Sequence, residues 1–362
     1  MTRISNARAP HAVDRASAWR PRGSRWIGVA LRRYGLWAVL VILTLVLCIV
    51  SSTFRSTYNL ENILEQNAII GVVACGMVVM MIAGGFDLSV GAVGAAASVV
   101  GASVSSHGGT VLAILAGLAV GVAAGAVNGL LVAKVKINAF IATFAMSSIV
   151  SGVLYVITSA QSEQGNSTFL SDVAGNRWGG IPIVFVVFLF FLALVWMLMT
   201  RTRYGHYVYS VGGNAEASHL SGVPVQRIQI LAFVIGGAFA GLAGLLLFGQ
   251  TGIGQPSAAS DWPLEAIAIC VVAGVALSGG VGRVPDVLAA TLILGVIADG
   301  LNQLNVSPYW QPAVTGLVII VAVALDQYNR MRRSTSAPPA AGQGAELPQA
   351  AAPSAPQPAA GH

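Results

Sequence analysis

Carboxylates inside apolar stretches are the residues of this sequence best placed to do chemistry, because an ionisable group at membrane depth is costly and marks a functional site by default. Asp87 lies in the segment Ala83–Gly91, where glycines interrupt an apolar run, and Phe86 and Ser89 flank it. A broken helix offers backbone groups to a passing solute, but an Asp or Ser there can also cap the next helix. Both roles stay open, and we expect Phe86, Asp87 and Ser89 to contribute to a solute path or its gate.

Further carboxylates and amides lie near the ends of apolar runs. Glu265 and Asp299 are predicted near the outer ends of two late runs, with Asp261 just outside one of them. Solvation at the interface accounts for these acids without chemistry, and we interpret Asp261 in that way. Asn128 and Asn302 carry amides that can bond a hydroxylated solute or a neighbouring backbone carbonyl. All except Asp261 are candidates for the solute path.

The remaining reactive residues do not support an enzyme active site. The five histidines are scattered over predicted tails and loops without metal-ligand spacing: His11, His107, His206, His219 and His362. A Walker A loop ends in Gly-Lys followed by Ser or Thr, but Lys134 and Lys136 each follow an apolar residue. Leu277–Val281 looks like the signature loop of a cassette ATPase, and without Walker A it is interpreted as a helix-end turn. We expect no catalytic residue, metal or cofactor, and any ATP hydrolysis must occur on another polypeptide.

The composition places these residues in a membrane protein. Of 362 residues, 56% are hydrophobic and 9% are charged, whereas soluble domains carry roughly 25% charged residues. Gly occurs 42 times, and small residues let membrane helices approach closely. A nucleic-acid binder is disfavoured, since Lys134 and Lys136 are the only lysines. We therefore predict an all-α integral membrane protein in the lipid bilayer.

Ten apolar runs are candidate membrane helices, since a bilayer core of about 30 Å requires roughly 20 residues. They cover approximately residues 34–51, 66–83, 88–105, 110–133, 139–159, 180–200, 228–250, 264–277, 284–301 and 313–325. Two of these runs are short, so half-membrane helices are an alternative there.

The basic residues orient the predicted spans. With a cytoplasmic N-terminus and ten crossings, Arg55 and Arg177 alone lie outside, and cytoplasmic loops are the ones that collect Lys and Arg. The predicted organisation is a basic cytoplasmic arm over 1–33, a membrane domain over 34–326, and a basic, then Ala- and Pro-rich disordered tail over 327–362. Both termini are then cytoplasmic.

The longest cytoplasmic connection, about 201–227, carries a predicted short helix over Ala215–Ser221. Asn214 is a good N-cap, Glu216 suits the positive end of a helix, and Gly222 can close it. These signals place a small helix outside the membrane.

That small helix carries an apolar tip, because Leu220 and Val223 remain exposed unless another surface covers them. A small amphipathic helix of this kind docks into the groove of a partner protein. The alternative is a helix that lies against its own bundle.

A series of short motifs follows one another between about Asn59 and Asp326. They are Gly85–Gly91, Asn128–Val132, Lys136–Ile137, Phe140–Thr143, Gly205 with Gly212–Val223, Leu264–Ala268, Leu277–Gly280 and Gly300–Gln311. Each motif alone is weak, but their order over ten spans is specific. In this order the chain resembles the permease subunits of bacterial ATP-binding cassette (ABC) importers for monosaccharides, typified by the ribose permease.

The resemblance implies two permease chains, as a homodimer or heterodimer, that form one sugar pathway in the bacterial inner membrane. It also implies two cassette ATPases beneath them and a periplasmic or extracellular sugar-binding protein outside. The loop helix becomes the coupling helix, which the ATPases pull to switch the permease between inward- and outward-facing states. Its implied coupling residues are Gly212, Gly213, Asn214, Glu216, Leu220, Ser221, Gly222 and Val223.

The sequence departs from the family pattern at four places. Ala273–Val275 replaces Gly-Gly-Thr, Pro285–Asp286 replaces Gly-Thr, Asp299 replaces Asn, and Asn138–Ala139 replaces Pro-Pro. These changes leave the sugar and the choice between homodimer and heterodimer open.

Other functions remain as alternatives. Permeases of the same fold carry furanosyl signalling molecules, polyols, nucleosides or branched-chain amino acids. An ion-coupled secondary transporter would instead use Asp87, Asp299 and Glu265 as cation or proton sites, and it would need no docking helix. An intramembrane hydrolase ranks last, since no plausible nucleophile and base were found.

Overall fold

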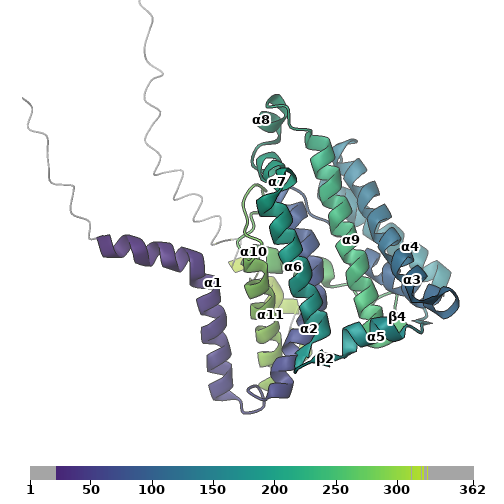
Figure 1. The fold of residues 1–362 in the computed structure, drawn as a ribbon, viewed down its shortest axis with the longest axis horizontal. Helices are drawn as coiled ribbons and strands as arrows, with labels where there is room; N and C mark the ends of the chain where they lie inside the picture. The colour runs from purple at the N-terminus through teal and green to yellow at the C-terminus, as the bar shows by residue number, and fades with distance from the viewer. Residues whose placement is uncertain (1–21, 311, 319, 322–323, 325–362) are drawn as a thin grey trace, which may run out of the picture.

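The structure is a computed structural model that describes residues 22–310, 312–318, 320–321 and 324 (Figure 1). Its helices in chain order are α1 (Arg22–Val50), α2 (Thr57–Ile82), α3 (Val90–Ala133), α4 (Ala139–Thr158), α5 (Thr168–Gly175), α6 (Ile183–Arg201), α7 (Arg203–Gly213), α8 (Ala215–Leu220), α9 (Val225–Thr251), α10 (Trp262–Val272), α11 (Asp286–Gln303) and the 3-10 helix η1 (Pro308–Trp310). Two antiparallel strand pairs connect loops of this described part: β1 (Glu163–Gln164) with β4 (Ile253–Gly254), and β2 (Arg177–Trp178) with β3 (Ile181–Pro182).

Within the described residues, six helices are long and apolar enough to cross a membrane: α2, α3, α4, α6, α9 and α11. The Tyr34–Val50 part of α1 and the whole of α10 are shorter apolar helices. α3 accounts for two predicted spans, because Gly109 interrupts it with a φ of +76°. The predicted all-α membrane class is confirmed. The count of ten stays a prediction, since the last predicted span, 313–325, lies partly outside the described residues, and the predicted tail, 327–362, lies wholly outside them.

Helix caps explain where predicted boundaries differ from the structure. α2 begins well before its apolar run, because the Oγ of Ser56 accepts the backbone N–H of Asn59 at 3.3 Å. α10 ends at Val272, short of the predicted boundary, because the chain turns at Gly274 with a φ of +78°. α1 begins at Arg22, inside the segment predicted as a basic arm.

α2 is the central helix of the bundle. Every residue from Ala68 to Ile82 is buried, as expected for a helix that is apolar on all sides. It packs against α6, α9, α10 and α11. A displacement of α2 therefore has to be accommodated by four other helices.

The second half of α3 packs against α9 through glycines. They recur at every fourth position, which aligns them along one face of the helix: Gly117, Gly121, Gly125 and Gly129. A Cβ at Gly121 would overlap the carbonyl oxygen of Gly237, and a Cβ at Gly125 would overlap that of Phe233. The two helices are therefore in direct backbone contact.

The bundle has two ends, which we name the α8 end and the α5 end. α7, α8 and the start of α9 lie at the α8 end, at the top of Figure 1, whereas α5, β2 and β4 lie at the opposite end. The segment predicted as the cytoplasmic connection, 201–227, belongs to the α8 end. α2 joins the two ends.

Two non-helical segments, 83–89 and 273–285, are partly buried near the α8 end. Irregular backbone at membrane depth is tolerated only where the protein satisfies its polar groups. Here the N–H of Leu88 donates to the Oγ1 of Thr143 at 3.0 Å, and the N–H of Gly280 donates to the carbonyl of Ile82 at 2.9 Å. These bonds fix the irregular segments to neighbouring helices.

Candidate functional site

The predicted loop helix is present as α8. The Oδ1 of Asn214 accepts the backbone N–H of Ala217 at 2.9 Å, and Glu216 lies in the first turn, where the helix dipole favours a negative charge. Gly222 closes the motif with a φ of +83°. The local signals of the sequence are therefore sufficient to form this helix.

The apolar tip of α8 consists of Leu220. This residue is 82% exposed, so the described part of the chain leaves a large apolar group mostly uncovered. The prediction that Val223 shares this exposure is wrong, because Val223 is half-buried and packs against the main core. The chain bends back at Gly222, so Val223 anchors the loop to the bundle while Leu220 projects from it. Ser221, between them, is exposed, and its Oγ donates to the carbonyl of Ala217 at 2.9 Å.

A cleft of about 530 Å³ lies beside α8, between this helix and the adjoining ends of α3 and α9. Its polar lining includes Lys136, Glu216, His219 and Arg227. The exposed tip of α8 thus stands next to an open groove of mixed charge.

Directly before α8, five glycines from three segments meet at what we call the glycine junction: Gly84, Gly212, Gly213, Gly279 and Gly280. A Cβ at Gly212 would overlap the carbonyl oxygen of Ile82, and a Cβ at Gly279 would lie 2.7 Å from the Cα of Gly84. Contacts this close exclude any side chain. The base of α8 is therefore in backbone contact with the end of α2.

The loop that follows α10 completes the glycine junction. Gly279 and Gly280 have φ values of +85° and +72°, a backbone conformation that favours glycine. The hydroxyl of Tyr209 on α7 donates to the carbonyl of Gly282 at 3.0 Å, and burial raises the pKa of this phenol, so it remains a donor. A turn is present at Leu277–Val281 as predicted, but it lies in the loop beyond the end of α10 at Val272 and not at a helix end, and its glycines serve this contact.

Asp87 belongs to a closed polar network near the same end. Its side chain is buried, and Oδ1 accepts both the N–H and the hydroxyl of Ser89, at 2.7 and 2.6 Å. The Nδ2 of Asn128 donates to the Oδ2 of Asp87 at 3.0 Å and to the Oγ of Ser89 at 2.8 Å. Phe86 packs against the main core. Asp87 therefore ties the start of α3 to the last turns of the same helix, beyond its interruption at Gly109.

The Asp87 network has one unsatisfied atom. Within the described residues, the Oδ1 of Asn128 is buried without a hydrogen-bond partner. A buried acceptor without a partner lowers the stability of the folded protein by about 1–3 kcal/mol. The network is consequently sensitive to any change in the donors and acceptors around it.

The other predicted path residues lie at a cavity of about 240 Å³ at the α5 end. Glu265, Asp299 and Asn302 line it, as does a group that the sequence analysis missed: Gln66, Asn67, Gln250 and Trp262. These residues come from α2, α9, α10 and α11, so only the packing of four helices brings them together. Amide side chains at the ends of the apolar runs were the sequence feature that could have indicated this cavity.

Asn59 joins α2 to α11 beside this cavity. Its Nδ2 donates to the Oδ2 of Asp299 at 2.7 Å, and its Oδ1 accepts from the Nε2 of Gln303 at 3.0 Å. Asp299 therefore both lines the cavity and holds two helix ends together.

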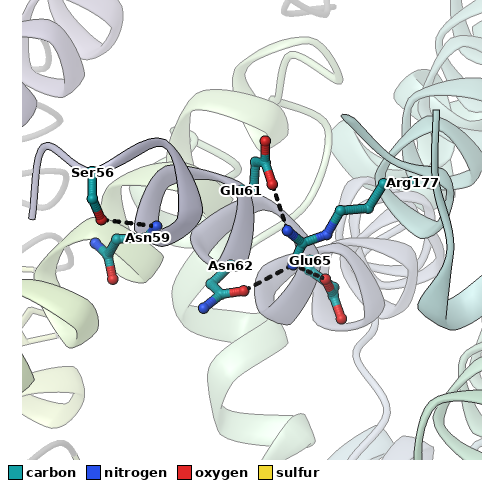
Figure 2. A network of polar contacts seen from close by, with 6 residues as sticks. All are labelled: Ser56, Asn59, Glu61, Asn62, Glu65 and Arg177. Atoms are coloured by element: carbon teal, nitrogen blue, oxygen red, sulfur yellow. Dashed lines mark hydrogen bonds and ion pairs between the residues drawn. The ribbon is translucent and has the colours of Figure 1, made fainter. Parts of the chain in front are cut away.

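A cationic clamp fixes the β2–β3 hairpin to α2 on the same side (Figure 2). Arg177 forms an ion pair with Glu61, another with Glu65 at 3.0 Å, and a hydrogen bond to the Oδ1 of Asn62 at 3.1 Å. Its guanidinium also lies 5.6 Å from the centre of the Tyr58 ring. The hydrogen bond to Glu65, followed by the charges of the two carboxylates, raises the pKa of Arg177. In the sequence, Arg177 indicated only which side of the membrane its loop faces.

The predicted path residues thus separate into two groups. Phe86, Asp87, Ser89 and Asn128 lie in the closed network toward the α8 end, whereas Glu265, Asp299 and Asn302 line the cavity at the α5 end. In the described part of the chain, His, Cys, Asp and Glu form no group of three that could hold a metal ion.

Comparison with known proteins gives concordant matches over most of the chain. Residues 59–323 match the family described as branched-chain amino acid transport system / permease component. The L-arabinose transport system permease protein AraH of Escherichia coli is 34% identical over 332 residues, which are 90% of this chain and 99% of that protein.

Two ribose permeases are similarly related. The ribose import permease protein RbsC of Escherichia coli is 38% identical, over 82% of this chain and 94% of its own length. RbsC of Bacillus subtilis is 36% identical, over 82% and 93%. No solved structure gives a significant match. The chain is a multi-pass membrane protein, and it belongs to the permease-component family of these transport systems.

Proposed function

We propose that this chain is the membrane-spanning subunit of an ABC importer that carries a monosaccharide into a bacterial cell. The relatives named for ribose and L-arabinose support the solute class. The observation that carries the transport mechanism is α8, a capped helix whose exposed Leu220 stands beside an open cleft. The chain itself performs no covalent chemistry.

On this proposal, a separate cassette ATPase binds Leu220 and the cleft beside it. The α8 end then faces the cytoplasm, in keeping with the concentration of basic residues in its loops. The complex lies in the inner membrane. A second permease chain completes the pathway, and a sugar-binding protein delivers solute at the α5 end.

Through the glycine junction, a displacement of α8 by this partner is transmitted to the membrane domain. A force on α8 acts on Gly213, which touches Gly280, and on Gly212, which touches the carbonyl of Ile82 at the end of α2 without intervening side chains. α2 is the central helix, and the segment that follows it carries Asp87. Closure of the ATPases therefore moves a packed two-state core rather than a flexible loop.

An ion-coupled secondary transporter is less well supported. Of the carboxylates that could bind its cation, Asp87 is already engaged with Ser89 and Asn128, which leaves Glu265 and Asp299 at the cavity of the α5 end. Such a transporter also has no use for an exposed apolar helix tip. The remaining same-fold substrates, such as polyols and nucleosides, are tested by the choice of solute in the uptake assay.

The test is Leu220→Asp in the full transporter, expressed with its own ATPase. A charge at the centre of a docking contact weakens the binding free energy by about 2 kcal/mol or more. We therefore expect roughly thirtyfold weaker binding of the ATPase and, as a result, loss of sugar uptake. Co-purification from native membranes and uptake of radiolabelled sugar measure the two effects.

Two controls make this result specific. Leu220→Met keeps an apolar tip and should retain binding of the ATPase. Phe169→Asp places the same charge on an exposed apolar position at the opposite end, on α5, and should also retain binding of the ATPase. Unchanged ATPase binding and uptake in Leu220→Asp would contradict the assignment of α8.

A further inference from the structure

The cavity at the α5 end has the composition of a recognition site for an uncharged polar solute. Six of its eleven lining residues carry an amide or a carboxyl group, and none is basic. Its volume of about 240 Å³ equals the share of about eight liquid waters at roughly 30 Å³ each. The cavity is therefore large enough for a small polyhydroxylated molecule.

The polar side chains of this cavity have hydrogen-bonding capacity to spare. Within the described residues, the side chains of Gln66, Gln250 and Glu265 make no hydrogen bond to other protein groups. Asn67 uses its Nδ2 to bond the carbonyl of Ile63 at 2.7 Å, which leaves its Oδ1 as an acceptor. Acceptors and amide donors in this mixture match hydroxyl groups, each of which both donates and accepts.

The lining of the cavity also contains apolar side chains. Trp262 contributes its ring, which is held in place because it packs against Gly94 and is 8% exposed. Ile69, Ile70 and Leu247 contribute aliphatic side chains to the same lining. A monosaccharide presents hydroxyl groups at its edge and C–H groups on its face, so a lining that combines polar groups with an aromatic ring and aliphatic side chains suits both.

The charge of the cavity selects against other solutes. Glu265 and Asp299 are its two acidic residues, and the absence of a basic lining residue leaves no partner for an anionic group. Carboxylates repel a sugar phosphate or the carboxylate of an amino acid at short range, and more strongly in a partly buried site. A neutral sugar carries no such penalty.

We propose that this cavity is a binding site for the monosaccharide on its way through the permease. Glu265, Gln250 and Gln66 bond its hydroxyl groups, and Trp262 lies against its C–H face. The inference rests on the proposed function and adds the residues that recognise the solute. It also assigns the selection of neutral over anionic solutes to this end of the molecule.

The experiment measures sugar imported per ATP hydrolysed, in proteoliposomes that contain the whole transporter and its binding protein, with radiolabelled D-ribose and L-arabinose as probes. Glu265→Gln replaces a charged acceptor by a neutral amide, which forms weaker hydrogen bonds, and Gln250→Leu removes the hydroxyl-bonding capacity of that side chain. We expect each to lower this ratio by roughly tenfold. Association with the ATPase and basal ATP hydrolysis should remain at the wild-type level.

Asp261→Asn is the matched control, because it removes one carboxylate from the same helix end but from an exposed residue outside the cavity lining. It should import sugar as the wild type does. A wild-type ratio in both cavity variants contradicts the cavity assignment alone. If the wild-type transporter imports neither sugar, the proposed function itself is contradicted. If Glu265→Gln fails to assemble, Gln250→Leu, which leaves the charge in place, decides the question.

Discussion

At the α8 end, segments meet through their backbones: Gly212 touches Ile82, and Gly279 touches Gly84. Around the cavity and the hairpin of the α5 end, segments meet mainly through side chains, as Asn59 bonds Asp299 and Arg177 bonds Glu65, although Gly249 there is in backbone contact with Leu170 of α5. Backbone contacts leave no room to adjust, whereas hydrogen-bonded side chains around a cavity can exchange partners with a solute. The contrast suits one end to transmit a displacement and the other to recognise a molecule.

The strongest test of this contrast is Gly212→Ala. The added methyl group overlaps the carbonyl oxygen of Ile82, and overpacking of this kind costs about 1–3 kcal/mol or more. We expect uptake to fall roughly tenfold or more while sugar binding is kept, because the change acts on the α8 end alone. Uptake by proteoliposomes and equilibrium sugar binding report the two quantities.

Gly152→Ala provides the control for a glycine replaced inside a membrane helix, since a Cβ there meets open space in α4. Its transport should match the wild type. Normal transport in Gly212→Ala would show that the glycine junction does not carry the coupling.

A smaller effect is expected for Asp87→Asn. The new amide can still accept from Ser89, but one of its N–H groups then faces the Nδ2 of Asn128, so a buried donor loses its acceptor at a cost of about 1–3 kcal/mol. The midpoint temperature of thermal unfolding and the maximal uptake rate should both fall, with little change in sugar affinity. The double variant Asp87→Asn with Asn128→Asp restores one donor and one acceptor and should recover part of the loss. A selective loss of sugar affinity would instead move Asp87 into the binding site.

The smallest effect is expected for Arg177→Ala, at the α5 end. Its ion pairs to Glu61 and Glu65 lie near the surface, where such pairs contribute little and are screened by salt. Uptake should fall by less than about twofold at low salt, and the difference should vanish near 1 M salt. An equally large defect at both salt concentrations would mean that the clamp does more than hold the hairpin.

The sequence was sufficient where short-range chemistry decides the structure. Asn214 and Gly222 predict both ends of α8 because a cap acts within one turn of a helix. The glycines of Leu277–Val281 likewise predict a turn. Membrane helices follow from apolar length alone, although Ser56 extends α2 beyond its apolar run.

Long-range packing accounts for what the sequence could not predict. Gln66 and Gln250 line one cavity although 184 positions separate them, and each alone is an ordinary amide near a helix end. Val223 is buried by the fold of the loop, which no local pattern encodes. The partner of Asp87 also required the packing of α3, since Asn128 approaches it from the far end of that helix.

The measurement that tests the central claim most directly is affinity purification of the full chain from native membranes, with identification of the co-purifying proteins and assay of ATP hydrolysis. We predict that a cassette ATPase purifies with the chain, that the complex hydrolyses ATP, and that Leu220→Asp releases the ATPase. A chain that purifies alone, with uptake driven by an ion gradient and insensitive to ATP, would contradict this account.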